Sequence, residues 1–212
     1  MFLLTCVTML AGLPGCGVVH VTAPFGQSDS LLNVEGEWTL LVDRVLPEMP
    51  ANQSIKMRVS PRPEAPGDYE VVFDHVTERQ ADGSPHTATY ELRIRRFGDD
   101  RLLFMRGMST TIEEPKKQYP HEHYFVHGLS AGMQDLGTPQ VLLVWMPDAT
   151  AFRMLADQAD LVVITNTQKE FTVDTHDRKL QALFGDMASR RELIQSLFYT
   201  TRPFILVRTP QN

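Results

Sequence analysis

Three histidines stand close together in one short stretch, at His121, His123 and His127. If residues 121–128 form a β-strand, the odd numbering of the three places their side chains on one face. Imidazole nitrogens are common zinc ligands, and His-x-His on a strand can direct two of them at one ion. The spacing therefore makes a metal site one candidate for this stretch.

The rest of such a metal site is left open by the sequence. His75, His86 or a carboxylate could supply a further ligand, and the spacing does not select among them. The alternative is a polar, solvent-facing edge strand, with Tyr124 and Val126 directed inward. A set of three imidazoles without an evident fourth ligand is more typical of that alternative. We expect no metal and no other cofactor.

Gly128-Leu129-Ser130-Ala131-Gly132 matches the G-x-S-x-G turn that carries the nucleophile of many serine hydrolases. Asp148 and His176 follow in the order Ser, Asp, His. That turn leads into a long helix in such enzymes, whereas here glycine and proline soon interrupt the chain. Only 46 positions separate Ser130 from His176, too few for the usual crossover units between triad members. We interpret the motif as a loop of small residues, so an enzyme is not the favoured hypothesis.

An uncharged, apolar run occupies residues 1–15 and ends just before a cysteine. The run has the length of a signal peptide and is too short to span a bilayer as a helix. The string Leu13-Pro14-Gly15-Cys16 resembles the lipobox of bacterial lipoproteins. The resemblance implies that the leader is cut before Cys16 and that Cys16 carries the acyl chains. Several acyl chains together would anchor the protein firmly to a membrane.

The same resemblance implies a place in the cell envelope. Gly17 follows the cysteine, where an Asp would hold many lipoproteins at the inner membrane. We therefore expect an anchor in the outer membrane and a domain that faces the periplasm. The leader lacks the usual Lys or Arg near its start, which an upstream start codon or an unusual leader would explain. An ordinary secretory signal, or a buried N-terminal strand, is the alternative.

Composition limits the class of protein. Without residues 1–15 the chain keeps 197 residues, enough for one domain with a sizeable core. The net charge of −6 argues against a nucleic-acid partner. Cys6 lies in the leader, so the domain after Cys16 contains no thiol and no disulfide, which suits an oxidising periplasm. No later stretch has 18 uninterrupted apolar residues, so we expect no second membrane segment.

The remaining chain divides into a tether and one β-rich domain. Residues 16–33 are predicted to be the lipid anchor and a polar, aperiodic tether, and residues 34–212 a single domain. Alternating apolar residues and turn signals predict strands, whereas helical spacing of leucines predicts two helices, the second beginning with a capping box at Ser189. The predicted strands are 34–42, 55–59, 69–75, 87–97, 101–107, 121–128, 141–146, 161–165 and 204–207, and the first helix covers about 175–187.

Gly36-x-Trp38, the run of antiparallel hairpins, the C-terminal helix and the closing strand resemble the lipocalin (calycin) family. The resemblance implies that Gly36 permits a tight backbone at the barrel floor and that Trp38 plugs this closed end. It also implies that Arg208 or Arg202 packs on Trp38 through a cation–π contact. The predicted fold is mainly β: an antiparallel lipocalin-like barrel or half-open barrel, with C-terminal helices and a closing strand. A β-sandwich or an open sheet with Trp38 in its core is the alternative.

Two main hypotheses for function follow. The first is a membrane-anchored binding module that buries a small apolar or amphipathic envelope molecule, such as a lipid or fatty acid, among Phe, Met, Leu and Val side chains. The residues that would line its site are not identified by the sequence. The second is a scaffold lipoprotein with a filled barrel and a protein partner in the envelope. A serine esterase that uses Ser130 is the third and least favoured hypothesis.

Overall fold

The computed structural model describes residues 18–41, 55–63, 65–79, 83–111, 120–132, 139–167, 170–176, 178–188, 196–198 and 203–210 of the chain. Strands dominate this part. They are β1 Val18–Val21, β2 Gln27–Ser28, β3 Gly36–Leu41, β4 Ile55–Pro61, β5 Asp68–Arg79, β6 Pro85–Phe97, β7 Asp100–Thr110, β8 Tyr124–Gly132, β9 Val141–Trp145, β10 Val163–Asn166, β11 Glu170–Val173 and β12 Phe204–Arg208. The helices are α2 Ala149–Gln158 and α3 Lys179–Ala188.

Eight of these strands form a closed antiparallel barrel. Strands β3 to β8 pair in chain order, β12 lies between β3 and β9, and β9 pairs with β8 to close the ring. Closure gives every strand of the ring a neighbour on both sides, so the ring has no exposed edge. The predicted antiparallel barrel with a closing strand is confirmed, and the β-sandwich and the open sheet are wrong.

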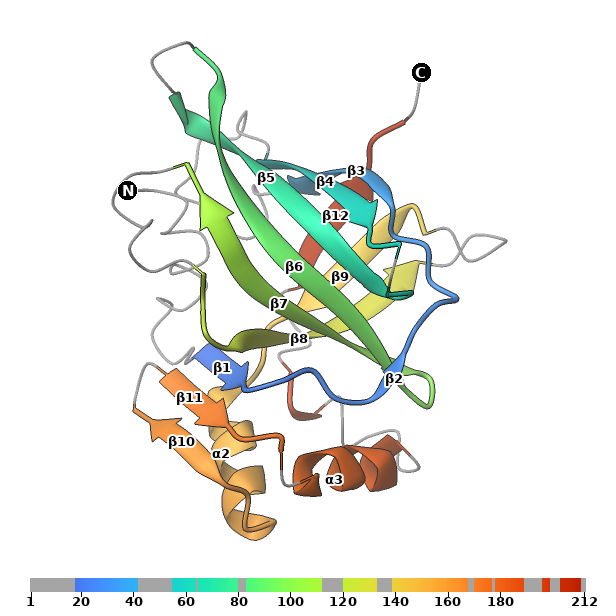
Figure 1. Ribbon diagram of the computed structural model, residues 1–212. Helices are drawn as coiled ribbons and strands as arrows, with labels where there is room; N and C mark the ends of the chain where they lie inside the picture. The colour runs from blue at the N-terminus through green and yellow to red at the C-terminus, as the bar shows by residue number, and fades with distance from the viewer. Residues whose placement is uncertain are drawn as a thin grey trace.

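A second layer lies against one side of the barrel (Figure 1). From β8 the sheet continues outward through β1, then β11, then β10. Strand β1 is antiparallel to β8 and parallel to β11, so it lies between segments from the middle and the end of the chain. Figure 1 shows α2 and α3 beside these three strands, below the barrel. We call β1, β10, β11, α2 and α3 the outer layer.

The two layers enclose two hydrophobic cores. On β7, Leu103 points into the barrel and its neighbours Leu102 and Phe104 point into the outer layer, because side chains alternate along a strand. The barrel core comprises Leu32, Val34, Trp38, Met57, Val59, Tyr69, Val71, Ala88, Tyr90, Leu92, Ile94, Leu103, Leu129, Leu142, Val144 and Leu206. The outer core includes Val19, Val21, Phe25, Phe97, Leu102, Phe104, Tyr124, Val126, Phe152, Phe171, Val173, Leu180, Phe184, Leu197 and Phe198.

The predicted tether over residues 16–33 is wrong from residue 18 onward. Val19 and Val21 of β1 are fully buried in the outer core, and Leu32 is buried in the barrel core. The physical reason is the apolar alternation of Val18-Val19-His20-Val21, which completes a sheet rather than staying in solvent. The folded domain therefore includes residues 18–33 as well as the part from residue 34 onward. Residues 1–17, with Cys16, lie outside the described residues.

The helices agree with the sequence in part. The predicted helix over 175–187 is confirmed as α3, which begins four residues later, at Lys179, and ends one residue later, at Ala188. Most of the predicted helix that begins at Ser189 lies outside the described residues. Helix α2 was not predicted, although Asp148 caps it by accepting bonds from the backbone N–H groups of Thr150 and Ala151. Neither helix in the described part of the chain has the length and apolar character that crossing a bilayer would require.

Candidate functional site

The end of the barrel at Trp38 is closed by a stacked pair of side chains. The Trp38 ring is fully buried, and its Nε1 donates to the Val34 carbonyl at 2.9 Å. The guanidinium carbon of Arg208 lies 4.6 Å from the centre of that ring, in a cation–π arrangement. Gly36 has a φ of +129°, and a Cβ there would lie 2.9 Å from Arg208 Nη1. Arg202, the other candidate for this role, lies outside the described residues.

Residues 29–35 cover this same end of the barrel. Arg208 donates to the carbonyls of Asn33, at 3.0 Å, and Glu35. The Tyr69 hydroxyl donates to the Leu32 carbonyl at 2.9 Å. We call this closed part of the molecule the Trp38 end. Its polar groups bond to backbone carbonyls and its Trp38 ring is buried, so packed side chains and backbone close this end of the barrel.

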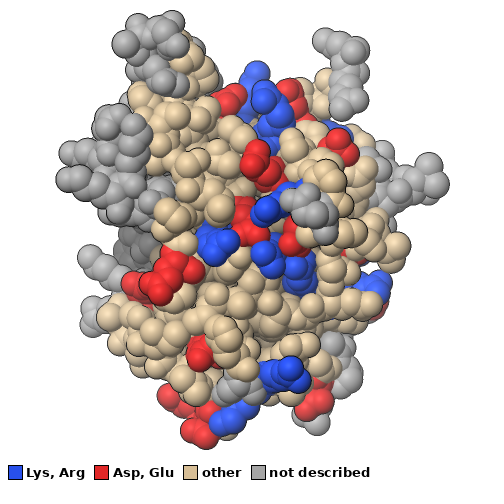
Figure 2. All heavy atoms as spheres, in the orientation of Figure 1, with Lys and Arg blue, Asp and Glu red and all other residues tan. Residues whose placement is uncertain are grey.

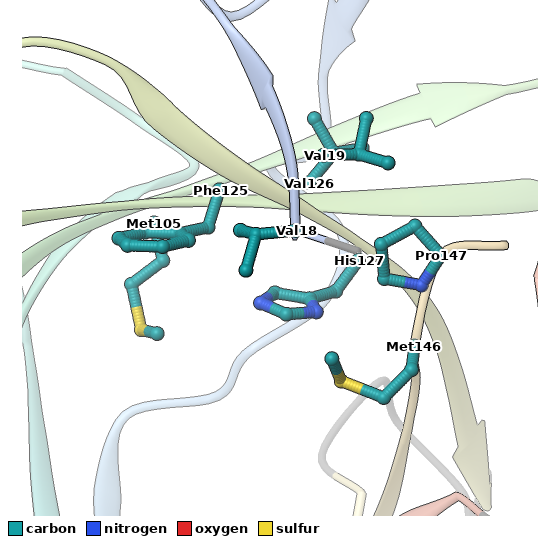
Figure 3. A pocket seen from close by; sticks show the side chains of 8 residues that line it. All are labelled: Val18, Val19, Met105, Phe125, Val126, His127, Met146 and Pro147. Atoms are coloured by element: carbon teal, nitrogen blue, oxygen red, sulfur yellow. The ribbon is translucent and has the colours of Figure 1, made fainter. Parts of the chain in front are cut away.

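The opposite end of the barrel contains a small pocket (Figure 3). The end of β8 at Gly132 pairs with Val141 of β9, which lies close to the Trp38 end through β12 and β3. The first half of β8 therefore lies toward the opposite end of the barrel. Figure 3 shows the pocket there, between β1, β8 and the chain that follows β9. Its volume is about 20 Å³, which is room for about one water. The residues that line it are Val18, Val19, Met105, Phe125, Val126, His127, Met146 and Pro147.

His127 is the polar side chain of this pocket. It lies on the barrel-facing side of β8, paired with Leu103 of β7, and only 7% of it is exposed. Its Nδ1 has no hydrogen-bond partner among the described residues. Burial, and next the charge of His20, lowers the pKa of His127 to about 4. The ring is therefore neutral at physiological pH and presents one unsatisfied nitrogen, which buried polar groups rarely do.

A group of histidines lies beside the pocket, around the ring of Phe125. His20 of β1 contacts Phe125 edge-on, with ring centres 4.5 Å apart, and His121 does so at 5.4 Å. The ring centres of His20 and His123 are 6.5 Å apart. We call His20, His121, His123 and His127 the histidine cluster. Burial lowers the pKa of His121.

His20 connects the histidine cluster to an acidic residue. Its Nδ1 lies 3.1 Å from Glu170 Oε1 on β11. A carboxylate only accepts hydrogen bonds, so Nδ1 carries the proton and Nε2 keeps a free lone pair. That Nε2 is buried and has no partner in the described part of the chain. Burial lowers the pKa of His20, although the neighbouring Glu170 opposes that shift.

The predicted convergence of His121, His123 and His127 on one metal ion is not found. Strand β8 begins at Tyr124, so His121 and His123 precede it in a bend, and strand alternation does not align them with His127. Among the described residues, no three His, Cys, Asp or Glu side chains are placed to hold a metal ion. The prediction of a solvent-facing edge strand is also wrong, since β8 lies between β7 and both β1 and β9.

The three residues of the esterase hypothesis belong to separate structures. Ser130 lies within β8, where the elbow would need a strand-to-helix turn, and its Oγ accepts a bond from Trp145 Nε1 at 3.0 Å. Asp148 is the N-cap of α2. His176 follows β11, and its Nδ1 bonds to Asp174 at 2.7 Å. No described hydrogen bond joins any two of the three.

An ionic network centred on the buried Glu91 lies on the outward-facing side of the barrel strands, next to the outer layer. The Glu91 side chain is 1% exposed and accepts bonds from Arg93, Arg106, Arg62 and the Tyr124 hydroxyl. Figure 2 shows acidic and basic side chains intermingled over this face, which carries β5, β6 and β7. Burial alone would raise the pKa of Glu91, but the hydrogen bonds from Arg93, Tyr124 and Arg106 lower it. Its four donors occupy this carboxylate, so we interpret the network as structural.

Comparison with protein-family models, with curated proteins and with solved structures gave no match to this chain. The inference of function therefore rests on the geometry of the two barrel ends. Sequence reasoning named His127 but not Val18, His20 or Glu170, which complete its surroundings. The sequence signal for β1 is the short apolar stretch of residues 18–21, which stands close after the leader.

Proposed function

We propose that this protein is a lipoprotein, anchored through Cys16 in the outer membrane, whose periplasmic barrel binds a small apolar or amphipathic envelope molecule. One observation carries the binding part of the proposal. The end of the barrel opposite Trp38 holds a pocket in which His127 is the one polar side chain among seven apolar described lining residues. An apolar pocket with a single placed polar group is the usual form of a site for such a molecule.

The size of the barrel supports the same proposal. An eight-stranded barrel is just wide enough for side chains to fill it or for one small ligand to enter. Here the Trp38 end is filled, and the hollow lies at the His127 end. Two of the lining residues, Met105 and Met146, are flexible thioethers that adapt to different shapes. We infer that a ligand enters from the His127 end and enlarges the pocket by moving these two side chains.

Native mass spectrometry of residues 17–212, recovered from a periplasm-like compartment, tests the binding function. This segment contains every described element, from Val18 onward. We expect a bound molecule of defined mass that is released on unfolding. Protein that stays at its own mass after incubation with a panel of apolar and amphipathic lipids contradicts the binding function.

The leader sequence supports the anchor. An apolar run that ends in Leu13-Pro14-Gly15-Cys16 is similar to lipoprotein leaders, and no other cysteine follows it. We expect wild-type protein to incorporate labelled palmitate and Cys16→Ser to incorporate none. Cys6→Ser is the matched control, since Cys6 lies within the leader and its loss leaves the label in place. Equal labelling of Cys16→Ser and wild type contradicts the anchor.

A scaffold lipoprotein is the second candidate, and one observation favours it. The barrel core is filled by large side chains, among them Trp38, Tyr69 and Tyr90, all of them buried. A filled barrel has a rigid outer surface and needs no ligand. In-cell crosslinking tests this function: a scaffold retains a defined protein partner and ignores apolar molecules, whereas the binding module takes up the molecule without that partner.

A further inference from the structure

In the described part of the chain, β1 is the strand that joins β11 and β10 to the barrel, and a histidine stands at that junction. We propose that protons added to His20 and His127 in acid separate β1 from β8 and so open the outer layer, while the barrel stays closed. The inference goes beyond the proposed binding function and holds whether or not the pocket takes a ligand.

The backbone pairing between β1 and β8 is short. It comprises two residue pairs, His20 with Phe125 and Val21 with Tyr124, and we call these two pairs the β1–β8 junction. Strand β8 pairs over five residues with β7 and over five with β9, which closes the ring. The ring does not use β1, so loss of the β1–β8 junction leaves each barrel strand with a neighbour on both sides.

His20 lies in the β1–β8 junction and is poorly placed to take up a proton. Its Nδ1 donates to Glu170 Oε1 at 3.1 Å, so an additional proton goes to Nε2. That Nε2 is buried without a hydrogen-bond partner among the described residues, and the side chain is 15% exposed. A charged N–H group there has neither an acceptor nor water, which is unfavourable. An open arrangement, in which water reaches Nε2, therefore binds the proton more readily.

His127 is in the same position on the β8 side. A charged imidazole carries a proton on both nitrogens, and Nδ1 of His127 is buried without a partner in the described part of the chain. Val18 and Val19 of β1 line the same pocket as His127 (Figure 3). Separation of β1 therefore removes one wall around this imidazole and admits water to it. Protonation of His127 favours the same opening as protonation of His20.

The titratable groups around His20 are mostly imidazoles. From β11, the half-exposed carboxylate of Glu170 faces it. From β8 and the residues just before it, His121, His123 and His127 lie close enough to act on it. Among the described residues, the charge that acts on His127 is that of His20. One carboxylate thus accompanies four imidazoles, so protons added to neighbouring rings repel one another.

The direction of the pH effect follows from burial. Burial lowers the pKa of His20 and of His121, and it lowers that of His127 to about 4, from the ordinary value of 6.5. The stabilisation of the closed junction by neutral imidazoles is therefore present above pH 6.5 and is lost as pH falls toward about 4. The residues of the described barrel core carry no group that titrates in this range, so acid does not act on that core.

Hydrogen exchange of the full mature protein at pH 7.5 and pH 5 tests the inference. Protection is the exchange rate of an unstructured chain at the same pH divided by the observed rate. We expect protection of β1 and β11 to fall at least about tenfold at pH 5, because a pKa of about 4 in the closed form favours the open form by more than that. Protection of β6 in the barrel should change by less than about twofold.

Two variants assign the effect to the buried histidines. His20→Gln combined with His127→Leu removes both titrating groups, so β1 should keep most of its protection at pH 5. His176→Gln is the matched control, since His176 follows β11 directly but its side chain is 75% exposed. This control should lose protection in β1 as the wild type does.

Three results overturn the inference. The first is equal protection of β1 at the two pH values. The second is an equal loss in β1 and β6, because acid then unfolds the whole molecule. The third is an undiminished loss in the double variant, which assigns the effect to other groups. The comparison of β1 with β6 in the wild type stands by itself if the double variant does not fold, and none of these results bears on the binding function, which is measured separately.

Discussion

The barrel core and the outer core are built in different ways. The barrel core takes its side chains from alternate positions of strands that are mostly consecutive in the chain, β3 to β9. The outer core collects β1, β8, β11 and both helices, so it joins residues as far apart in the chain as Val19 and Phe171, which pair between β1 and β11. One core is local in sequence and the other is not.

The comparison explains where the candidate site lies. The pocket of His127 is lined by Met105 and Phe125, whose side of the strand faces the barrel, and by Val19 and Val126, which belong to the outer core. The pocket therefore lies at the boundary between the barrel core and the outer core, where the side chains of neither core fill the space. This boundary between the two cores contains the buried imidazole of His127, whereas buried polar groups without a partner are rare within a hydrophobic core.

The largest effect is expected at Glu91, which joins the two regions through its bond from Tyr124 of the outer core. Removing one partner of a buried ionic network leaves the other charges uncompensated, so Glu91→Ala should lower the free energy of unfolding by about 3–5 kcal/mol. Urea denaturation measures it. Glu70→Ala is the control, because Glu70 lies directly opposite on β5 but is exposed. A similar loss in both variants contradicts a special role for Glu91.

Adjacent leucines on β7 compare the two cores directly. Leu102 faces the outer core and Leu103 the barrel core, and both are buried. Each change to Ala should cost about 2–5 kcal/mol, from lost burial and the cavity that remains. Hydrogen exchange then separates them: Leu102→Ala should speed exchange in α3 first, and Leu103→Ala in the barrel strands. Identical exchange patterns would show that the cores do not differ in this way.

The pH dependence of the free energy of unfolding tests whether His127 is buried in its neutral form. The ordinary pKa of histidine is 6.5, and burial lowers that of His127 to about 4, so the unfolded chain binds its proton first as pH falls. The stabilisation from neutral His127 is present above pH 6.5 and is lost as pH falls toward about 4, a difference of about 3 kcal/mol. His127→Leu should remove this part of the pH profile. An unchanged slope between pH 6.5 and 4 would mean that His127 is not buried in its neutral form.

A smaller effect is expected at the start of α2, in the outer layer. Asp148 satisfies two backbone N–H groups of the first turn, so Asp148→Ala should cost about 1 kcal/mol. Amide exchange should rise within α2 and stay unchanged in the barrel strands. Asp157→Ala, at an exposed position of the same helix, should change stability by less than about 0.5 kcal/mol. A global rise in exchange for Asp148→Ala would indicate that the outer layer and the barrel open together.

The local barrel could be predicted from sequence for a physical reason. Strands such as β4 alternate apolar and polar residues with a period of two, and Gly98, with a φ of +59°, lies in the turn that joins β6 to β7. The pairing of neighbours then follows from short connections. The lipocalin resemblance, and not strand pairing, predicts Gly36, Trp38 and Arg208 or Arg202 at one place; the structure pairs Arg208 with Trp38 between β12 and β3.

The outer layer could not be predicted in the same way. Strand β1 has four residues and its partners lie far along the chain, so nothing within its own sequence says which edge it joins. Helix α2 has its signal in Asp148 as a capping residue and in the spacing of the buried Phe152 and Ala156. The spacing of the histidines predicts His127 as a site residue. His20 lies near His127, and Glu170 bonds to His20, only because strands far apart in the chain pair with one another.

Strand β1 also sets a constraint on the order of events during folding. It lies between β8 and β11 in the sheet. Its parallel pairing with β11 joins residues that are separated by most of the chain, such as Val18 and Glu170. Contacts of such large sequence separation close slowly, because loop-closure entropy is lost before they form. Strand β1 precedes every other described strand in the chain, yet it is thus among the last to find its partners. We expect refolding in which the barrel hairpins gain protection early and β1, α2 and α3 gain it in a later, shared phase.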